Sequence, residues 1–157
     1  MNVYLLRHGV AELKTRTDAE RQLSPLGKKN IVNIAAQFRA SKYSIDRCIA
    51  SPYLRARQTA ELFLNAIELG IKLESNSMLL SQNKAVDVLR FLETAKEKNI
   101  LLVGHNPLLS ELFGLLTQGS TNYDMKILAA GELCCIHFET VGAGLGKNLF
   151  NLAPGKN

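Results

Sequence analysis

Near its N-terminus the chain reads Val3-Tyr4-Leu5-Leu6-Arg7-His8-Gly9. Its first four residues form a short apolar run, which is typical of a fully buried β-strand. The run stops at an arginine and a histidine, and a polar loop follows as far as about Gln22. This stretch predicts a buried strand that delivers polar side chains to the end of a sheet.

The same plan recurs along the chain, because apolar runs alternate with helical segments. Ser24-Pro25 predicts the start of a helix, since serine caps helix N-termini and proline suits the first helical position. Ser51-Pro52 and Asn106-Pro107 repeat this signal and predict two further helix starts. We expect the remaining elements as follows: strands at residues 3–6, 45–50, 71–73 and 100–103, a helix from 52 to about 69, a helix from about 84 to 96, and a final antiparallel hairpin of residues 132–138 and 148–152.

Strand–helix units in series indicate a parallel sheet with helices on both faces. We therefore predict a three-layer α/β/α fold with a mostly parallel sheet. The chain has 157 residues, 46% hydrophobic and 21% charged, which suits one domain over residues 1–157 and excludes intrinsic disorder.

Charge and cysteine usage narrow the class of protein. The net charge is +5, but apart from Lys28-Lys29 the basic residues are scattered, so a nucleic-acid groove is not indicated. A positive excess does suit an anionic substrate such as a phosphate. Cys48, Cys134 and Cys135 form no metal or disulfide pattern, and we expect reduced core thiols. With no signal peptide and no stretch of membrane-spanning length, we expect a cytoplasmic monomer that binds neither nucleic acid nor membrane.

Polar residues follow three of the predicted strands. Arg7-His8-Gly9 follows the first, Ser51 to Arg55 the second, and Gly104-His105-Asn106 the strand at residues 100–103. Taken singly, each has an ordinary structural explanation as a loop residue, a solvated side chain or a helix cap. Ligands of open α/β sheets, however, bind beyond the carboxyl ends of the strands. The convergence of two histidines and two arginines at that edge therefore predicts a functional site.

Phosphoryl transfer is the chemistry that suits this cluster. A neutral imidazole at His8 can attack phosphorus and form a phosphohistidine, which water then hydrolyses. Guanidinium groups at Arg7 and Arg55 favour that neutral form and bind the equatorial phosphoryl oxygens. Gly9 allows the backbone to approach a ligand closely, and Ser51 is a further candidate for substrate binding, at the start of a helix whose N-terminus at Pro52 adds N–H donors. No metal or other cofactor is required, because the histidines lack carboxylate or thiolate co-ligands at suitable spacing.

The same residues carry a resemblance to a known family. The chain resembles the histidine phosphatase superfamily, which is related to cofactor-dependent phosphoglycerate mutases, in three motifs that occur in order: Leu6-Arg7-His8-Gly9, Ser51-Pro52-Tyr53-Leu54-Arg55-Ala56-Arg57-Gln58-Thr59-Ala60 and Val103-Gly104-His105-Asn106-Pro107. Its compact length, Arg21 and the stretch Leu23-Ser24-Pro25-Leu26-Gly27 are similar to the SixA-type phosphohistidine phosphatases.

The resemblance implies a phosphoglycerate mutase-like fold and assigns roles to individual residues. It implies His8 as the nucleophile, Arg7 and Arg55 as phosphate binders, and His105 as a further residue of the phosphate pocket that acts in the transition state. Arg21, from the first loop, is a further candidate for substrate binding.

The sequence departs from the family pattern in the supply of a proton donor. Many members provide a carboxylic acid from the loop after the third strand, but residues 75–82 contain no Asp or Glu. Asp18 and Glu20 are candidate donors, and ordinary solvated charges explain them equally well. A missing acid disfavours phosphomonoesters, whose alkoxide is a poor leaving group, more than phosphohistidine, whose imidazole leaves as a weaker base. Val10 also stands where SixA-type sequences often have an acidic residue.

Chain length bears on the partner. Little sequence is left for a cap over the pocket, so we expect an open site that admits a folded protein. The leading hypothesis is a phosphohistidine phosphatase for a signalling or phosphocarrier protein, such as a histidine phosphotransfer domain. A phosphatase for a small phosphorylated metabolite is the alternative. A non-catalytic phosphate-binding module is disfavoured, because His8, both arginines (Arg7 and Arg55) and His105 are all intact.

Overall fold

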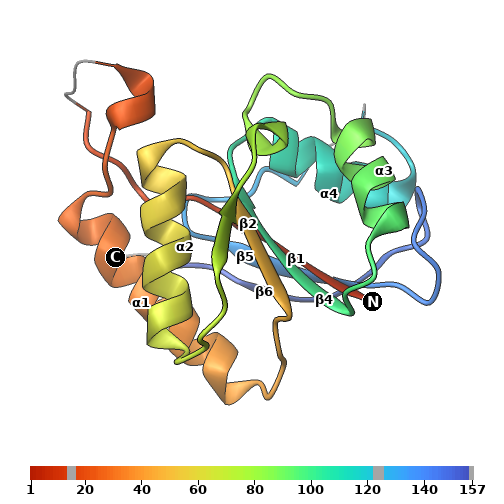
Figure 1. Cartoon of the computed structure of the whole chain (residues 1–157), viewed down its shortest axis with the longest axis horizontal. Coiled ribbons are helices and arrows are strands. Elements are labelled where there is room, and N and C mark those ends of the chain that lie inside the picture. The colour runs from red at the N-terminus through yellow and green to blue at the C-terminus, as the bar shows by residue number, and fades with distance from the viewer. Residues whose placement is uncertain (14–16, 122–125, 156–157) are drawn as a thin grey trace.

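A computed structural model describes residues 1–13, 17–121 and 126–155 of the chain. These residues form a six-stranded sheet with helices on both faces (Figure 1). The strands are β1 (Asn2–Arg7), β2 (Arg47–Ala50), β3 (Leu73–Ser75), β4 (Asn99–Gly104), β5 (Leu133–His137) and β6 (Lys147–Leu152). The helices are α1 (Pro25–Ala40), α2 (Leu54–Ala66), α3 (Ala85–Thr94) and α4 (Leu108–Gln118), with short 3-10 helices η1 (Asp18–Glu20) and η2 (Ser77–Leu79).

The strand order is β3-β2-β4-β1-β5-β6. Neighbouring strands from β3 to β1 are parallel, whereas β5 pairs antiparallel with both β1 and β6. This arrangement confirms the predicted α/β fold with a mostly parallel sheet and a final antiparallel hairpin. The short strand lies at Leu73–Ser75, slightly later than predicted.

The two faces of β1 contribute to different halves of the core. Val3 and Leu5 pack in a cluster with α3 and α4, whereas Tyr4 and Leu6 pack with α1 and α2. All four side chains are fully buried. Because side chains alternate along a strand, a sheet covered on both faces needs a continuous apolar run, as residues 3–6 provide.

The helix starts agree with the sequence only in part. At α1 the hydroxyl of Ser24 accepts the N–H of Gly27 at 3.0 Å, and Pro25 is the first helical residue, as predicted. The predicted cap at Ser51 is wrong, because α2 begins at Leu54 and the Ser51 hydroxyl bonds to a histidine instead.

The third predicted start is also displaced. Helix α4 begins at Leu108, with Pro107 rather than Asn106 at the capping position. The Asn106 amide instead donates to the carbonyl oxygen of Leu128 at 3.0 Å and accepts from the Ser110 hydroxyl at 2.9 Å. The side chain that was expected to cap a helix therefore joins two segments of the chain.

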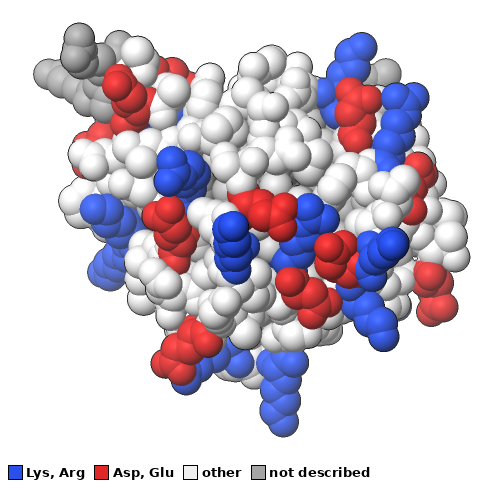
Figure 2. All heavy atoms as spheres, viewed as in Figure 1, with Lys and Arg blue, Asp and Glu red and all other residues white. Residues whose placement is uncertain are grey.

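On one face of the molecule the charged side chains are scattered (Figure 2), and the three cysteines are buried, as the sequence predicts. Figure 2 shows acidic and basic side chains interspersed on one face, with no field of a single sign. Arg47, for example, bonds to both Glu74 and Glu97. The three cysteines are buried free thiols. Within the described ranges, no helix has the length and apolar character needed to cross a membrane.

Candidate active site

The register of the parallel strands brings three predicted site residues together at one edge of the sheet: Arg7, His8 and His105. Arg7 pairs with Gly104 across β1 and β4, and Ala50 pairs with Val103 across β2 and β4. The ladder continues one residue further, because His8 N donates to the Gly104 carbonyl at 3.0 Å. Consequently His8 and the residue after Gly104, His105, emerge side by side, with ring centroids 5.0 Å apart.

The ring of His8 has a defined proton position. Its Nδ1 lies 2.8 Å from the carbonyl oxygen of Gly9, which can only accept, so Nδ1 carries the proton. Burial lowers the pKa of His8 to about 4; the bond to Gly9 opposes this shift, and the charges of Arg55 and Arg7 add to it. The imidazole is therefore neutral near neutral pH, and its Nε2 has a free electron pair for attack on phosphorus.

Arg55 is buried beside that electron pair. Its Nε donates to His8 Nε2 at 3.2 Å. Its other two nitrogens bond to Asp18: Nη1 lies 2.6 Å from the carbonyl oxygen and Nη2 lies 3.0 Å from the carboxylate. The guanidinium also stacks over the Tyr53 ring, 5.0 Å from its centroid. These contacts fix the plane of a donor group directly beside the nucleophilic atom.

Arg7 approaches the site from the face of the sheet that α3 and α4 cover, opposite to the face that carries α2 and Arg55. Its Nη1 donates to the carbonyl oxygen of Leu128 at 2.7 Å, and its Nε is buried without a hydrogen-bond partner. Burial lowers the pKa of Arg7, although a guanidinium stays charged in proteins. An unpaired buried N–H of a cation is a natural place for an anion to bind.

His105 is almost wholly buried, with 2% of its surface exposed. Its Nε2 lies 2.7 Å from the hydroxyl of Ser51, and its ring meets Tyr53 edge to face. Burial lowers the pKa of His105 to about 3, and the neighbouring His8 and Arg55 add to the shift. Its Nδ1 is buried without a partner.

The other predicted residues lie at differing distances from this centre. Arg21 donates from Nε to the Glu12 carbonyl at 2.8 Å and pairs with Asp18 at 3.1 Å, so it lies at the rim. Glu20 is exposed and accepts from the Thr17 hydroxyl. Of the two candidate proton donors, Asp18 alone bonds to residues of the site.

Gly9 makes its close approach to a helix. A Cβ at this position would lie 3.1–3.2 Å from atoms of Leu23, Gly27 and Ile31. The N–H of Gly9 donates to the Thr59 hydroxyl at 3.1 Å, and that hydroxyl donates to the Arg55 carbonyl at 2.7 Å. Close packing against α1 therefore accounts for this glycine, and contact with a substrate stays a prediction.

Sequence reasoning quoted Thr59 in the second motif without assigning it a role, and it missed Leu128. Thr59 lies one helical turn after Arg55, so their shared helix face was a usable signal. Leu128 contributes only backbone atoms, which leave no mark in the side-chain pattern. Its carbonyl nevertheless accepts from both Arg7 and Asn106.

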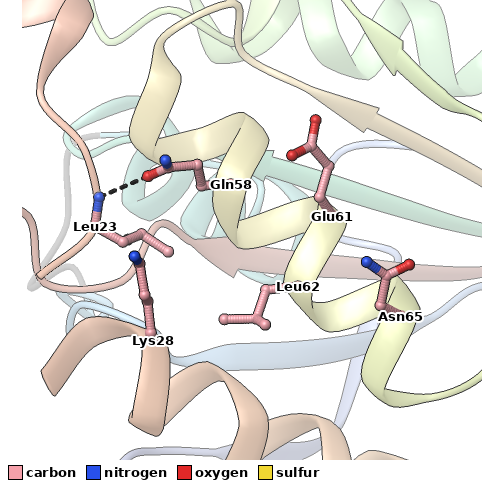
Figure 3. Close-up of a pocket in the computed structure, with 6 residues that line it drawn as sticks. All are labelled: Leu23, Lys28, Gln58, Glu61, Leu62 and Asn65. Atoms are coloured by element: carbon pink, nitrogen blue, oxygen red, sulfur yellow. Dashed lines mark hydrogen bonds between the residues drawn. The ribbon is translucent and has the colours of Figure 1, made fainter. Parts of the chain in front are cut away.

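A surface cleft of about 320 Å³ lies between the start of α1 and the outer side of α2 (Figure 3). It is lined by Leu23, Lys28, Gln58, Glu61, Leu62 and Asn65. The dashed bond in Figure 3, from Leu23 N to Gln58 Oε1 at 2.7 Å, ties the end of the first loop to α2. The cleft contains no predicted site residue, and its Gln58 anchors the loop that carries Asp18 and Arg21.

Comparison with known proteins places this geometry in a family. The family model of the histidine phosphatase superfamily (branch 1) matches residues 3–79. A phosphohistidine phosphatase SixA homolog of Haemophilus influenzae is 31% identical over 123 residues, which cover 71% of this chain and 74% of that protein. Phosphohistidine phosphatase SixA of Escherichia coli strain K12 is 29% identical over 124 residues, or 77% of each chain.

A solved structure agrees with these relatives. The protein histidine phosphatase SixA in complex with tungstate superposes with a TM-score of 0.87 at 25% identity, over 98% of this chain and 97% of that one. The sequence relatives and the shared architecture lead to one conclusion. This chain belongs to the histidine phosphatase superfamily as a SixA-type member, and it is a phosphatase.

Proposed function

We propose that this phosphatase hydrolyses phosphohistidine on a partner protein, through a covalent phosphoryl intermediate on Nε2 of His8. The observation that carries the proposal is the bond from His8 Nδ1 to the Gly9 carbonyl at 2.8 Å, because it leaves Nε2 as the unprotonated, nucleophilic atom beside the guanidinium of Arg55. The substrate class is supported by the SixA relatives, which are described as phosphohistidine phosphatases.

The first step transfers the phosphoryl group between two imidazoles. The electron pair of His8 Nε2 forms a bond to phosphorus while the nitrogen–phosphorus bond of the substrate breaks. The electrons of the broken bond stay on the substrate nitrogen. The His8 ring gains positive charge, which the Gly9 carbonyl stabilises through Nδ1–H. The Nε–H of Arg55, which bonds to His8 Nε2 in the free protein, turns to a phosphoryl oxygen.

The second step hydrolyses the intermediate. Water attacks phosphorus, the bond to His8 Nε2 breaks, and the product leaves as dihydrogen phosphate, which carries the water oxygen and both of its protons. The electron pair returns to Nε2, which restores the neutral ring. Arg7 and Arg55 remain beside the phosphoryl oxygens throughout, so their charges stabilise both transition states.

The proton requirement favours phosphohistidine over a phosphomonoester. When the second ring nitrogen of a phosphohistidine is protonated, the imidazole leaves as a neutral molecule and needs no acid from the enzyme. An alkoxide does need one. Asp18, the carboxyl group that bonds to the site, has a lowered pKa: burial raises it, but hydrogen bonds from Arg55 and Arg21 outweigh that effect. An ionised Asp18 has no proton to give.

A side-by-side assay tests the substrate. Turnover of a phosphorylated histidine phosphotransfer domain is compared with turnover of glycerol phosphate, an ordinary phosphomonoester. We expect efficient release of phosphate from the protein and little from the ester. Efficient hydrolysis of the ester, with the phosphoprotein left untouched, would contradict the proposal and favour a small-metabolite phosphatase.

Trapping tests the intermediate. After incubation with the radiolabelled phosphoprotein and a rapid quench, we expect acid-labile label on the wild-type enzyme and none on His8→Ala. His137→Ala is the matched control, because His137 lies at the far end of β1, where its Nδ1 bonds to Asn2 at 2.8 Å. Equal label on wild type and His8→Ala would exclude the covalent mechanism.

A further inference from the structure

We propose that Ser51 is a positioning residue that sets the proton of His105. Its hydroxyl donates to Nε2 of His105 and so holds the ring proton on Nδ1, where it can donate to an oxygen of the phosphoryl group on His8. The last step of this inference rests on the proposed function, whereas the proton assignment rests on the free protein alone.

The hydrogen bonds of Ser51 determine the direction of donation. Its side chain is fully buried, and its oxygen lies 2.7 Å from His105 Nε2. The same oxygen accepts the backbone N–H of Tyr53 at 3.4 Å, and that group can only donate. A hydroxyl has a single proton. Among the described residues His105 is the one acceptor within reach of it, so the proton points to Nε2.

The opposite tautomer would leave more groups unsatisfied. If Nε2–H of His105 donated to Ser51, the hydroxyl proton would have no acceptor, and Nδ1 would be a buried lone pair without a donor. The proposed tautomer leaves one group, Nδ1–H, without a partner in the free protein. Because unsatisfied buried polar groups are costly, the tautomer with the proton on Nε2 is disfavoured. The low pKa of His105 keeps the ring neutral, so one nitrogen alone holds a proton.

The remaining N–H has an evident use. The ring of His105 lies 5.0 Å from that of His8, the proposed nucleophile. A phosphoryl group on His8 brings three oxygens to this space, and each is an acceptor. Both histidines then carry the proton on Nδ1 for opposite purposes: in His8 it bonds to Gly9 and frees Nε2, whereas in His105 it stays available as a donor.

The sheet holds Ser51 in place for this role. Its backbone N–H donates to the Val103 carbonyl at 2.9 Å, which continues the ladder between β2 and β4. His105 follows the end of β4 directly. The hydroxyl and the imidazole are therefore presented by two hydrogen-bonded strands, which limits their relative motion.

Nitrogen NMR reads the tautomer directly. The chain has three histidines, so ¹⁵N-histidine labelling gives a simple spectrum, assigned with His8→Gln and His137→Gln. We expect His105 to carry its proton on Nδ1 in the wild type and to shift toward Nε2 protonation in Ser51→Ala. Ser110→Ala is the matched control, because it removes another buried hydroxyl that bonds to Asn106 rather than to a histidine. It should leave the His105 tautomer unchanged.

The second part of the proposal is that Nδ1–H of His105 donates to an oxyanion, and tungstate serves as the probe for it. On titration we expect the Nδ1 resonance of wild-type His105 to move, and we expect Ser51→Ala to bind tungstate about 10-fold more weakly. Wild-type His105 protonated on Nε2 would overturn the proposal without any variant, as would a tautomer unchanged in Ser51→Ala. An Nδ1 resonance that tungstate leaves in place would overturn the donor role. None of these readings uses turnover, so a failure of the phosphohistidine assay is distinguishable from them.

Discussion

Asp18 occupies both terminal nitrogens of Arg55, with its carbonyl oxygen 2.6 Å from Nη1 and its carboxylate 3.0 Å from Nη2. A short 3-10 helix in the first loop thereby orients an arginine of α2 whose Nε faces the nucleophile. Arg21 bonds to the other carboxylate oxygen and holds the loop residue from outside. The geometry makes Asp18 an anchor for Arg55, and this role differs from that of a proton donor.

Substitution of Asp18 separates the two roles. We expect Asp18→Ala to lower kcat/KM for a phosphohistidine protein about 10-fold, because Arg55 loses a charge-assisted hydrogen bond. Asp18→Asn keeps an acceptor oxygen for Nη2, so we expect a loss of only about 2-fold to 3-fold. If Asp18 were the proton donor, the two variants would be equally impaired, and both would lose the alkaline limb of the pH–rate profile.

The depressed pKa of His8 predicts how stability depends on pH. The unfolded chain takes up a proton near the ordinary value of 6.5, whereas the folded protein resists protonation until about 4. Within this window the unfolded state binds more protons, so the free energy of unfolding falls as the pH falls, by up to about 1.4 kcal/mol per pH unit. Above the window this histidine makes no difference to the pH dependence.

Urea denaturation at several pH values checks this expectation. The His8→Gln variant has no such group, so between about pH 6.5 and pH 4 its stability should fall less steeply than that of the wild type. The pKa of His105 is also lowered in the fold, so this residue makes stability fall with falling pH in the wild type and in His8→Gln alike. Parallel curves for the two proteins would show that His8 titrates normally in the fold. Activity that depends on neutral His8 should likewise persist well below the ordinary histidine pKa.

Replacement of Arg55 by lysine tests planar recognition. The guanidinium bonds simultaneously to His8 Nε2 and to two oxygens of Asp18. A lysine ammonium keeps the charge but cannot reproduce this fork. We expect Arg55→Lys to lower kcat/KM about 100-fold. The matched control is Arg57→Lys, since Arg57 is exposed and pairs with Glu61 on the surface; unchanged activity in Arg55→Lys would mean that charge alone suffices.

The sequence predicted the convergence at the site because parallel strands end at one edge of a sheet. Arg7, His8 and His105 each follow or end a strand, and their meeting depends only on the strand register that the apolar runs imply. The resemblance to the histidine phosphatase superfamily followed for the same reason, since its three motifs lie at those strand ends. The positions of the helices on both faces followed from the period of their apolar residues.

The sequence could not predict which partner each polar side chain would choose. Ser24, Ser51 and Asn106 all precede proline and all suit a helix cap, but Ser24 alone serves as one. The same hydroxyl and amide groups bond equally well to a neighbouring segment, and the choice depends on tertiary contacts. The Leu128 carbonyl was beyond reach because a backbone acceptor has no residue-type signature.

Gly27 offers the sharpest test of how the first loop is held. In an isolated helix alanine is more favourable than glycine by about 1 kcal/mol, so Gly27→Ala within α1 would ordinarily stabilise the protein. Here an added Cβ would overlap with the carbonyl oxygen of Val10. That oxygen accepts from both the N–H and the hydroxyl of Ser24, at 2.9 and 3.1 Å, so it cannot move without breaking the cap. We therefore expect Gly27→Ala to lower the free energy of unfolding by roughly 2 kcal/mol or more, measured by urea denaturation. Gly70→Ala is the control, because its Cβ would meet no atom within 4 Å, and a Gly27→Ala protein as stable as this control would show that the loop is free to shift away from α1.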